Sequence, residues 1–223
     1  MLEKIGTKPY RHISQPASDA LMVLDRVLAT TPEPTVAEIG VGVGATTIEL
    51  VRRMKNRGKL LLFDFEDRVR ELETELKAAG FTNIEALGNT RLTYDSYCWN
   101  LAKIALDRRA RGDGPLLDFA FLDGAHNFIN DAPAALILKS LLKPGGYLLF
   151  DDLLWTYDSS PSMANNPTVR LWFTQEQAAA AQVKIVCDLF FENDPDFTKE
   201  TFGGKISRRR ALYRKMPTTP AQS

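Results

Sequence analysis

The stretch Ala37-Glu38-Ile39-Gly40-Val41-Gly42-Val43-Gly44-Ala45-Thr46 carries three glycines at alternate positions. The apolar run Val36 to Ile39 precedes the glycines, and Thr46 to Met54 follows them with apolar residues at helical spacing. A glycine-rich turn between a strand and a helix lets the backbone approach a ligand closely, and the helix N-terminus offers unpaired N–H donors. The stretch therefore predicts a strand, a glycine loop and a helix that together form a cofactor site.

Further apolar runs of strand length alternate with segments of helical spacing. The predicted strands are Lys59 to Phe63 before Asp64, Asn83 to Leu87, Leu117 to Leu122 before Asp123, and Tyr147 to Phe150 before Asp151; the predicted helices are Arg68 to Ala79, Ser96 to Arg109 and Pro133 to Leu142. Because parallel neighbours need a crossover connection, this order predicts an α/β fold with a doubly wound, mainly parallel sheet and helices on both faces. Ligands of such sheets bind at the carboxyl ends of the strands.

Residues outside this alternation complete the predicted organisation. Ser18 to Ala29 is expected to be an amphipathic helix before the first strand, and Arg170 to Ala181 a helix after the last parallel one. Lys184 to Phe191 is strand-like and Ala211 to Lys215 is a terminal strand. No convincing helix separates these two, so we expect them to be antiparallel neighbours. Residues 217–223 are expected to form a flexible tail.

The charge balance limits the classes of partner. The 223 residues include 28 basic and 28 acidic side chains, so no overall positive field would hold a phosphate backbone, and we expect no nucleic-acid partner. The triplet Arg208-Arg209-Arg210 is interpreted as a solvated turn between two strands. No stretch approaches the ~20 apolar residues that cross a bilayer, and the N-terminus lacks a run of signal-peptide length. We therefore expect a cytoplasmic protein with no membrane association.

Acidic residues around the glycine loop help to distinguish between two possible cofactors, NAD and S-adenosylmethionine. Gly40 to Ala45 also fits the loose G-x-G-x-x-A pattern of NAD enzymes, so the loop alone is ambiguous. Glu38 favours S-adenosylmethionine, because a carboxylate suits the cationic methionine portion and repels a pyrophosphate. Asp64 lies at about the 20-residue spacing at which an acidic side chain accepts from ribose hydroxyls, and Glu66 competes for that role. Alternatively, Glu38 and Asp64 only cap strand ends or pair with basic neighbours.

With these residues in view, the sequence from about Ile13 to Lys215 resembles the class I S-adenosylmethionine-dependent methyltransferases. Within that superfamily it looks like the cation-dependent O-methyltransferases of the catechol and caffeoyl-CoA type. Three motifs carry this likeness: the glycine stretch, Asp118-Phe119-Ala120-Phe121-Leu122-Asp123, and Leu142-Lys143-Pro144-Gly145-Gly146-Tyr147-Leu148-Leu149-Phe150-Asp151-Asp152-Leu153-Leu154-Trp155. Looser relatives that methylate sugars share these motifs, some with Asp-Gly-x-His, as in Asp123-Gly124-Ala125-His126.

The resemblance implies a fold, an activity and a cofactor site. The implied fold is a single Rossmann-like methyltransferase domain over residues 1–216, with a seven-stranded sheet whose C-terminal strand is antiparallel. The implied activity is methylation of a hydroxyl group on a small molecule. The implied cofactor residues are Glu38, Gly40, Gly42, Gly44, Thr46, Asp64, Glu66 and Asp123. Because the related cation-dependent enzymes are often dimers, a homodimer is also expected.

Three aspartates are expected to meet at the cofactor edge of the sheet, because Asp123 and the pair Asp151-Asp152 end adjacent predicted strands. Two carboxylates ~4 Å apart repel each other by ~4 kcal/mol at an effective dielectric of about 20, so the site needs a cation, a shared proton or an outward-turned group. All-oxygen ligands favour Mg²⁺, or else Mn²⁺ or Ca²⁺, which would activate a substrate hydroxyl. We therefore predict a divalent metal at these aspartates, although the family pattern has asparagine where this chain has Asp152.

His126 is the predicted catalytic base, because an imidazole near its ordinary pKa can take a proton from a hydroxyl group. It could instead only hydrogen-bond Asp123 or the backbone. The nearest alternative enzyme keeps the cofactor and uses His126 or Asp123 as the base without a metal. More distant alternatives are an NAD-dependent oxidoreductase and a non-catalytic cofactor-binding module.

Overall fold

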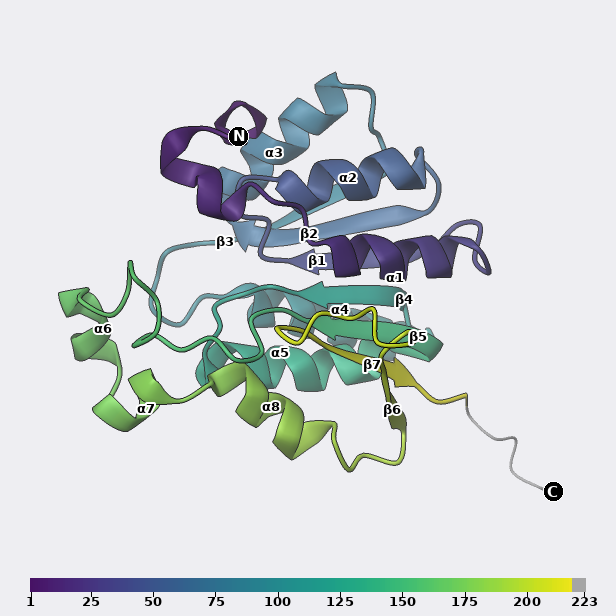
Figure 1. Cartoon of the computed structure of the whole chain (residues 1–223). Helices are drawn as coiled ribbons and strands as arrows, with labels where there is room; N and C mark the ends of the chain where they lie inside the picture. Colours follow the sequence, from purple (N-terminus) through teal and green to yellow (C-terminus); the bar gives the residue numbers. More distant parts are fainter. Residues whose placement is uncertain (218–223) are drawn as a thin grey trace.

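The computed structural model describes residues 1–217, which contain a single seven-stranded sheet in the order β3-β2-β1-β4-β5-β7-β6 (Figure 1). The strands are β1 (Thr35–Ile39), β2 (Lys59–Phe65), β3 (Ile84–Asn89), β4 (Leu117–Leu122), β5 (Leu142–Phe150), β6 (Phe197–Glu200) and β7 (Ala211–Lys215). The first five strands pair in parallel, and β7 pairs antiparallel with both β5 and β6. The predicted fold class is confirmed.

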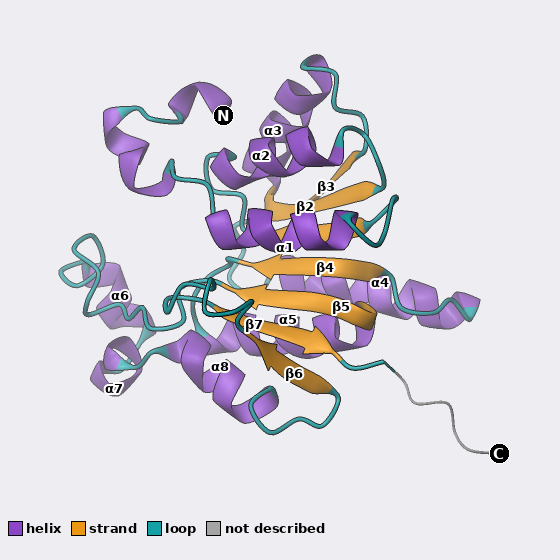
Figure 2. Cartoon of the chain, turned by 45° about the vertical axis from the view of Figure 1, so that its right-hand side comes forward, coloured by secondary structure: helices purple, strands orange, loops and turns teal. Residues whose placement is uncertain are grey.

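Helices cover both faces of this sheet. The described helices are η1 (Leu2–Lys4), η2 (Lys8–Ile13), α1 (Ser18–Leu28), α2 (Ala45–Met54), α3 (Glu66–Ala78), α4 (Tyr97–Arg111), α5 (Phe128–Leu141), α6 (Pro167–Trp172), α7 (Gln175–Ala179) and α8 (Gln182–Phe190). Helices α1, α2 and α3 share one hydrophobic cluster with the sheet, and α4, α5 and α8 share another. Figure 2 shows these two groups on opposite sides of the strands.

Alternating side chains along the strands explain the two clusters. In β2, Leu60 and Leu62 belong to the cluster under α1 to α3, whereas Leu61 and Phe63 belong to the cluster under α4, α5 and α8. Successive strand residues point to opposite faces, so a strand that is covered on both faces is apolar throughout. This is why the central strands were recognisable as unbroken apolar runs.

The strand predicted over Lys184 to Phe191 is wrong, because this segment is helix α8. Val183, Val186 and Cys187 lie at the i, i+3, i+4 spacing of a helix, and they bury one face in the cluster that includes α5. The place expected for this strand beside β7 is taken by β6, which pairs antiparallel with β7 and has Phe197 opposite Lys215. Tertiary packing therefore overrode the β-branched composition of the segment.

Several predicted helix boundaries also differ from the observed ones. Helix α5 begins at Phe128 rather than at Pro133, because Asn127 caps it by accepting a hydrogen bond from the Asn130 N–H (2.9 Å). The helix predicted over Arg170 to Ala181 is two short helices, α6 and α7, and Thr174 caps the second with a capping box. Of the tail predicted over 217–223, residues 218–223 lie outside the described part of the chain.

None of the helices within residues 1–217 combines the length and the apolar character that crossing a bilayer requires. The cytoplasmic location stays a prediction from the sequence.

Candidate active site

The glycine loop lies across the carboxyl ends of three neighbouring strands. Gly40 follows β1, donates its N–H to the carbonyl of Phe63 in β2 (2.8 Å), and has a positive φ of 88°. A Cβ atom at Gly40 would lie 1.8 Å from the carbonyl oxygen of Asp123 after β4, so only glycine fits there. The Val41 N–H donates to Asp64 Oδ2 (3.0 Å), which fixes the loop to the end of β2. These contacts hold the backbone of Gly40 and Val41 in one position between the ends of β1, β2 and β4.

Glu38 lies inside the protein directly before this loop. Its side chain is buried, and its Oε2 atom has no hydrogen-bond partner within residues 1–217. Burial raises the pKa of Glu38 to about 8, the nearby Thr47 hydroxyl opposes the rise, and the carboxylates of Asp123 and Asp64 add to it. A buried carboxylate without a partner is costly, so this atom is suited to a cationic or hydrogen-bond-donating ligand group.

His126 lies between two aspartates at the acidic edge of the sheet. Its Nε2 atom is 3.6 Å from Asp123 Oδ1 and 3.7 Å from Asp152 Oδ2. His126 and Asp152 both have positive φ values, 53° and 50°, which residues other than glycine rarely adopt. The Asp123 side chain is 32% exposed; its partial burial and the neighbouring Asp151 and Asp152 raise its pKa above the usual range, although Arg210 and Arg209 oppose the rise. Two strained residues therefore face each other where the carboxylates gather.

Two arginines from the loop before β7 contact the other aspartates. Arg209 Nη2 donates to Asp152 Oδ1 (2.6 Å), and its Nε lies 3.3 Å from Asp151 Oδ1. Arg210 Nη2 donates to Asp151 Oδ2 (3.0 Å), while its Nη1 donates to Asp19 Oδ2 in α1 (3.2 Å). The Arg210 side chain is 10% exposed and those of Asp151 and Asp19 are 5% exposed, so this is a buried ionic network. The interpretation of the arginine triplet as a solvated turn is wrong for Arg210.

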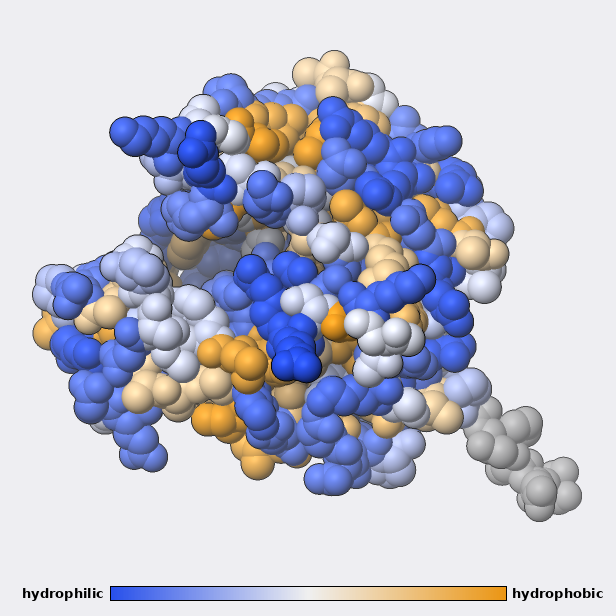
Figure 3. All heavy atoms as spheres, in the orientation of Figure 1, coloured by the Kyte–Doolittle hydropathy of each residue, from blue (hydrophilic) through white to orange (hydrophobic). Residues whose placement is uncertain are grey.

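The molecule is hollowed next to the glycine loop. Figure 3 shows the surface recessed between the N-terminal segment and the α6 region, on the side where β4 and β5 end in Figure 2. A cavity of about 260 Å³ lies between the N-terminal segment and the loop, and its lining includes Tyr10, Ile13, Gly42, Val43 and Arg91. A small molecule at the carboxyl edge of the sheet would therefore lie partly under residues that precede α1.

Comparisons with known proteins agree with this geometry. The model of a family described as a methyltransferase domain matches residues 37–153, from β1 to just beyond β5, which is more than half of the chain. The chain belongs to this methyltransferase family. Its resemblance to methyltransferases, inferred from the three sequence motifs, is confirmed. A search of curated proteins by sequence finds no match.

Solved structures of O-methyltransferases share the fold of this methyltransferase. TomG from Streptomyces achromogenes, an O-methyltransferase of tomaymycin synthesis solved in complex with SAM, is 17% identical, with a TM-score of 0.61 over 96% of this chain and 89% of TomG. A protein from Staphylococcus aureus assigned as a caffeoyl-CoA O-methyltransferase is 16% identical, with a TM-score of 0.59 over 96% of this chain and 91% of its own. At these identities the likeness shows a common fold.

The methyltransferase structure brings most of the predicted cofactor residues together. Glu38 and Asp64 both flank the glycine loop, and Asp123 lies against Gly40. Glu66, the alternative to Asp64, begins α3, pairs with Arg70 and is 52% exposed. A role for each of these residues in cofactor binding stays a prediction, and Asp64 is the better placed of the two candidates for the ribose.

Two of the predicted cofactor residues have local structural roles. The Thr46 hydroxyl accepts a hydrogen bond from the Ala17 N–H (3.0 Å), which ties α2 to the segment before α1. Gly44 has a φ of 85° and is the N-cap residue of α2 without a side-chain cap, so the first N–H groups of this helix keep free hydrogen-bonding capacity. Gly42 also has a positive φ, and a Cβ there would meet open space.

The three aspartates do not fit a divalent cation as they are arranged. In the described residues, the group of at least three acidic, histidine or cysteine side chains with ligand atoms within 4.8 Å of one another is Glu3, Glu71 and Glu75, which surrounds the Met1 amino group. Asp123, Asp151 and Asp152 form no such group, and guanidinium groups contact the last two. The predicted metal site therefore gains no support from the side-chain geometry.

No local pattern in the sequence indicates the residues that hold the Asp123 to Asn127 turn in place. The Tyr97 hydroxyl in α4 donates to Asp131 Oδ1 in α5 (2.5 Å) and accepts from the Ala125 N–H (3.2 Å). Asp131 is buried, which raises the pKa of its carboxyl. A Cβ at Gly124 would lie 2.6 Å from the Tyr97 hydroxyl, so the glycine of Asp-Gly-x-His makes room for this support. Tyr97 and Asp131 are 34 residues apart in the sequence, so their contact leaves no local pattern there.

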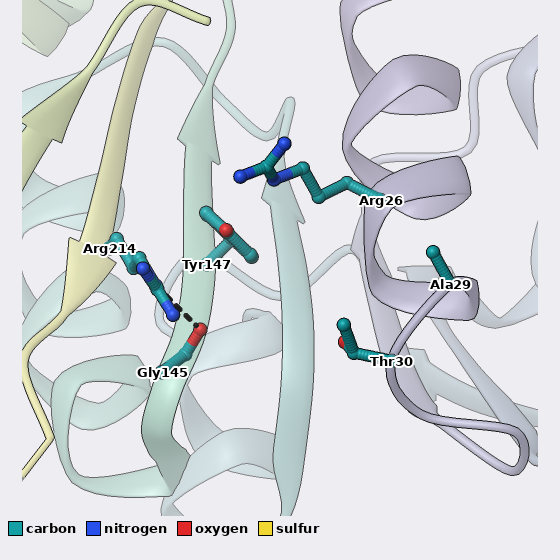
Figure 4. Close-up of a pocket in the computed structure, with 6 residues that line it drawn as sticks. All are labelled: Arg26, Ala29, Thr30, Gly145, Tyr147 and Arg214. Atoms are coloured by element: carbon teal, nitrogen blue, oxygen red, sulfur yellow. Dashed lines mark hydrogen bonds between the residues drawn. The ribbon is translucent and has the colours of Figure 1, made fainter.

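A second cavity, of about 430 Å³, lies away from these residues (Figure 4). Arg26, Ala29 and Thr30 at the end of α1 line one side, and Gly145, Tyr147 and Arg214 line the other. Gly145 and Tyr147 lie in β5 before its carboxyl end, which is the end that leads to Asp151. Because ligands of such sheets bind at the carboxyl ends of the strands, we assign the chemistry to the edge that holds Asp151 and the glycine loop, and not to this cavity.

Proposed function

We propose that this chain is an S-adenosylmethionine-dependent O-methyltransferase that acts on a hydroxyl group of a small molecule. The observation that carries the proposal is the buried Glu38 Oε2 atom without a partner, beside a glycine loop in a methyltransferase domain. The amino group of the methionine portion would supply the missing positive partner. A pyrophosphate would bring no positive partner to Glu38, which disfavours an NAD enzyme.

S-adenosylmethionine supplies a methyl group to a nucleophilic oxygen: the O–C bond forms, the C–S bond breaks, and S-adenosylhomocysteine leaves. Around it, Glu38 would bind the ammonium group and the loop backbone would lie against the cofactor. Each oxygen of Asp64 accepts one backbone hydrogen bond and keeps lone pairs free for ribose hydroxyls. The protein's main contribution would be to align the acceptor with the methyl group.

The proton of the acceptor hydroxyl needs a base. His126 Nε2 would take this proton, and the carboxylates of Asp123 and Asp152 on either side would stabilise the resulting imidazolium. Asp123 is the alternative base. Arg209 and Arg210 already contact Asp151 and Asp152, so these carboxylates are not arranged to hold a metal ion beside the acceptor.

Calorimetry on the full chain tests the cofactor part of the proposal. We expect S-adenosylhomocysteine to bind with micromolar or better affinity and NAD to show no saturable heat. Saturable binding of NAD without binding of S-adenosylhomocysteine would overturn the proposal in favour of an oxidoreductase.

The catalytic part is tested with a methyl-donor assay against phenolic, sugar and acyl-bearing hydroxyl compounds. With an active acceptor, His126→Ala should lower kcat by roughly 100- to 10,000-fold, the usual contribution of a general base. His12→Ala is the matched control, since His12 is exposed in η2 and should leave kcat unchanged. Equal kcat values for the two variants would exclude His126 as the base.

A further inference from the structure

The guanidinium groups of Arg209 and Arg210 contact the carboxylates on which the sequence predicted a divalent cation. Asp151 uses both oxygens: Oδ1 lies 3.3 Å from Arg209 Nε and accepts from the Asp152 N–H (2.7 Å), and Oδ2 accepts from Arg210 (3.0 Å). Asp152 Oδ1 accepts from Arg209 (2.6 Å). The described contacts leave few oxygens of these two residues free to ligate an ion.

The charges of these residues also argue against a bound divalent cation. Arg209 and Arg210 pair with Asp151 and Asp152, and Arg210 also pairs with Asp19, so the arginines already reduce the repulsion that made a bound cation necessary. An incoming divalent ion would have to approach Arg209 and Arg210 at close range, with like-charge repulsion, or displace them. Displacing Arg210 would also break its hydrogen bond to Asp19, which is buried in α1.

We propose that Arg209 and Arg210 replace the divalent cation in this site, and that removal of Arg209 uncovers a latent metal site on Asp123, Asp151 and Asp152. Arg210 is the buried structural member, because it links α1 to the end of β5. Arg209 is 58% exposed and covers Asp151 and Asp152 from the solvent side. Arg209 is thus a positioning residue that holds Asp152 beside His126. The positioning role of Arg209 rests on the proposed function, whereas the replacement of a cation by the two arginines does not.

Metal binding tests the inference without any methyl acceptor. The full chain is dialysed against EDTA, and Mn²⁺ binding is measured by electron paramagnetic resonance and calorimetry. We expect no stoichiometric binding at the aspartates of the wild type, and at least tenfold tighter Mn²⁺ binding after Arg209→Gln. Arg209→Lys keeps the positive charge and should stay close to the wild type. Arg208→Gln is the matched control, because Arg208 is the exposed neighbour in the same loop.

Asp152→Ala locates the bound ion, because it removes the side-chain oxygens altogether. Added to Arg209→Gln, it should abolish the gained Mn²⁺ binding, whereas weak binding that survives it belongs elsewhere, for instance at Glu3, Glu71 and Glu75. Tight Mn²⁺ binding by the wild type that Asp152→Ala removes would overturn the inference, and so would an Arg209→Gln variant that folds, by its thermal transition, without gaining affinity. Neither outcome affects binding of S-adenosylhomocysteine, which tests the proposed function separately.

Discussion

Two buried carboxylates at the same edge of the sheet have opposite environments. Glu38, in β1, has an oxygen without a hydrogen-bond partner in the described part of the chain, and burial raises its pKa to about 8. Asp151, after β5, is 4% exposed and accepts or pairs through both oxygens with Arg209, Arg210 and the backbone. Within residues 1–217, the Glu38 half of the site has no counter-charge, whereas the Asp151 half has two guanidinium counter-charges, even though Arg210 Nε itself has no hydrogen-bond acceptor.

This difference assigns separate tasks to the two halves. A carboxylate that stays buried without a counter-charge lowers stability, so its retention beside a glycine loop fits a ligand that brings the charge. A carboxylate whose arginines come from the same chain has no such need, and its network instead orients Asp152 and, through it, His126. Substitutions of Glu38 should therefore change the affinity for the cofactor, and substitutions of Arg210 should change the free energy of unfolding.

The largest effect is expected for Arg210→Met, which removes a counter-charge from the Asp151 half. Asp151 and Asp19 would each lose a buried guanidinium partner, Asp151 keeping only the partly exposed Arg209 and Asp19 a backbone N–H among the described contacts, and breaking a buried ion pair in this way costs about 3–5 kcal/mol of unfolding free energy. Urea unfolding monitored by circular dichroism measures this loss. Arg208→Met, in the exposed part of the same loop, should change stability by less than about 0.5 kcal/mol. Equal stabilities of the two variants would contradict the buried network.

The next largest effect concerns the glycine loop, which joins the two halves where Gly40 meets Asp123. Gly40→Ala should lower the unfolding free energy by roughly 3 kcal/mol, because its Cβ must push the Asp123 backbone away in addition to adopting a positive φ. Gly42→Ala is the matched control: it has a positive φ but open space, so only the conformational cost of about 1–2 kcal/mol applies. Similar losses in both variants would show that the contact with Asp123 does not constrain the loop.

The two halves also differ in how far the sequence could predict them. The strand, glycine loop and helix around Glu38 are local in sequence, and Asp64 and Asp123 follow apolar runs that identify strand ends, so the meeting of the glycine loop with these acidic residues was predictable. Arg209 and Asp152 are 57 residues apart, and no pattern in either segment indicates that they pair. The acidic edge was therefore interpreted as a metal site without its counter-charges.

A similar limit applies to the last third of the fold. The segment of α8 has a β-branched pair, Ile185 and Val186, that favours a strand, and only the cluster shared with α5 reveals why it is a helix. The terminal strand β7 was predicted correctly because its apolar run is short, isolated and close to the chain end. Local patterns are sufficient where the pattern itself decides the structure, and they fail where a distant neighbour decides it.

A smaller effect is expected for cofactor affinity in Glu38→Gln. Loss of a charge-assisted hydrogen bond to the methionine ammonium should weaken S-adenosylhomocysteine binding by about 1.5–3 kcal/mol, or roughly 10- to 100-fold. Calorimetry measures the change, and Glu49→Gln, on the solvent side of α2, is the control that should keep wild-type affinity. At pH 7 the wild type should also release close to one proton on binding, seen as a dependence of the heat on the buffer. An unchanged Kd would place the ammonium elsewhere.

The smallest effect, and the one that addresses Glu38 alone, is the pH dependence of stability without ligand. The pKa of Glu38 is raised from 4.5 to about 8 in the folded chain, so between these values the folded state holds a proton that the unfolded state has lost. The stabilisation from Glu38 is thus complete below the unfolded pKa and is lost as the pH rises through the folded one, at up to about 1.4 kcal/mol per pH unit for one proton. Glu38→Gln removes this dependence. Between pH 6.5 and 7.5, urea unfolding should therefore show the variant gaining about 1.4 kcal/mol on the wild type, with the difference levelling off above about pH 8. A constant difference would mean that Glu38 titrates near its ordinary pKa, and the contrast with Asp151 would then lose its electrostatic basis.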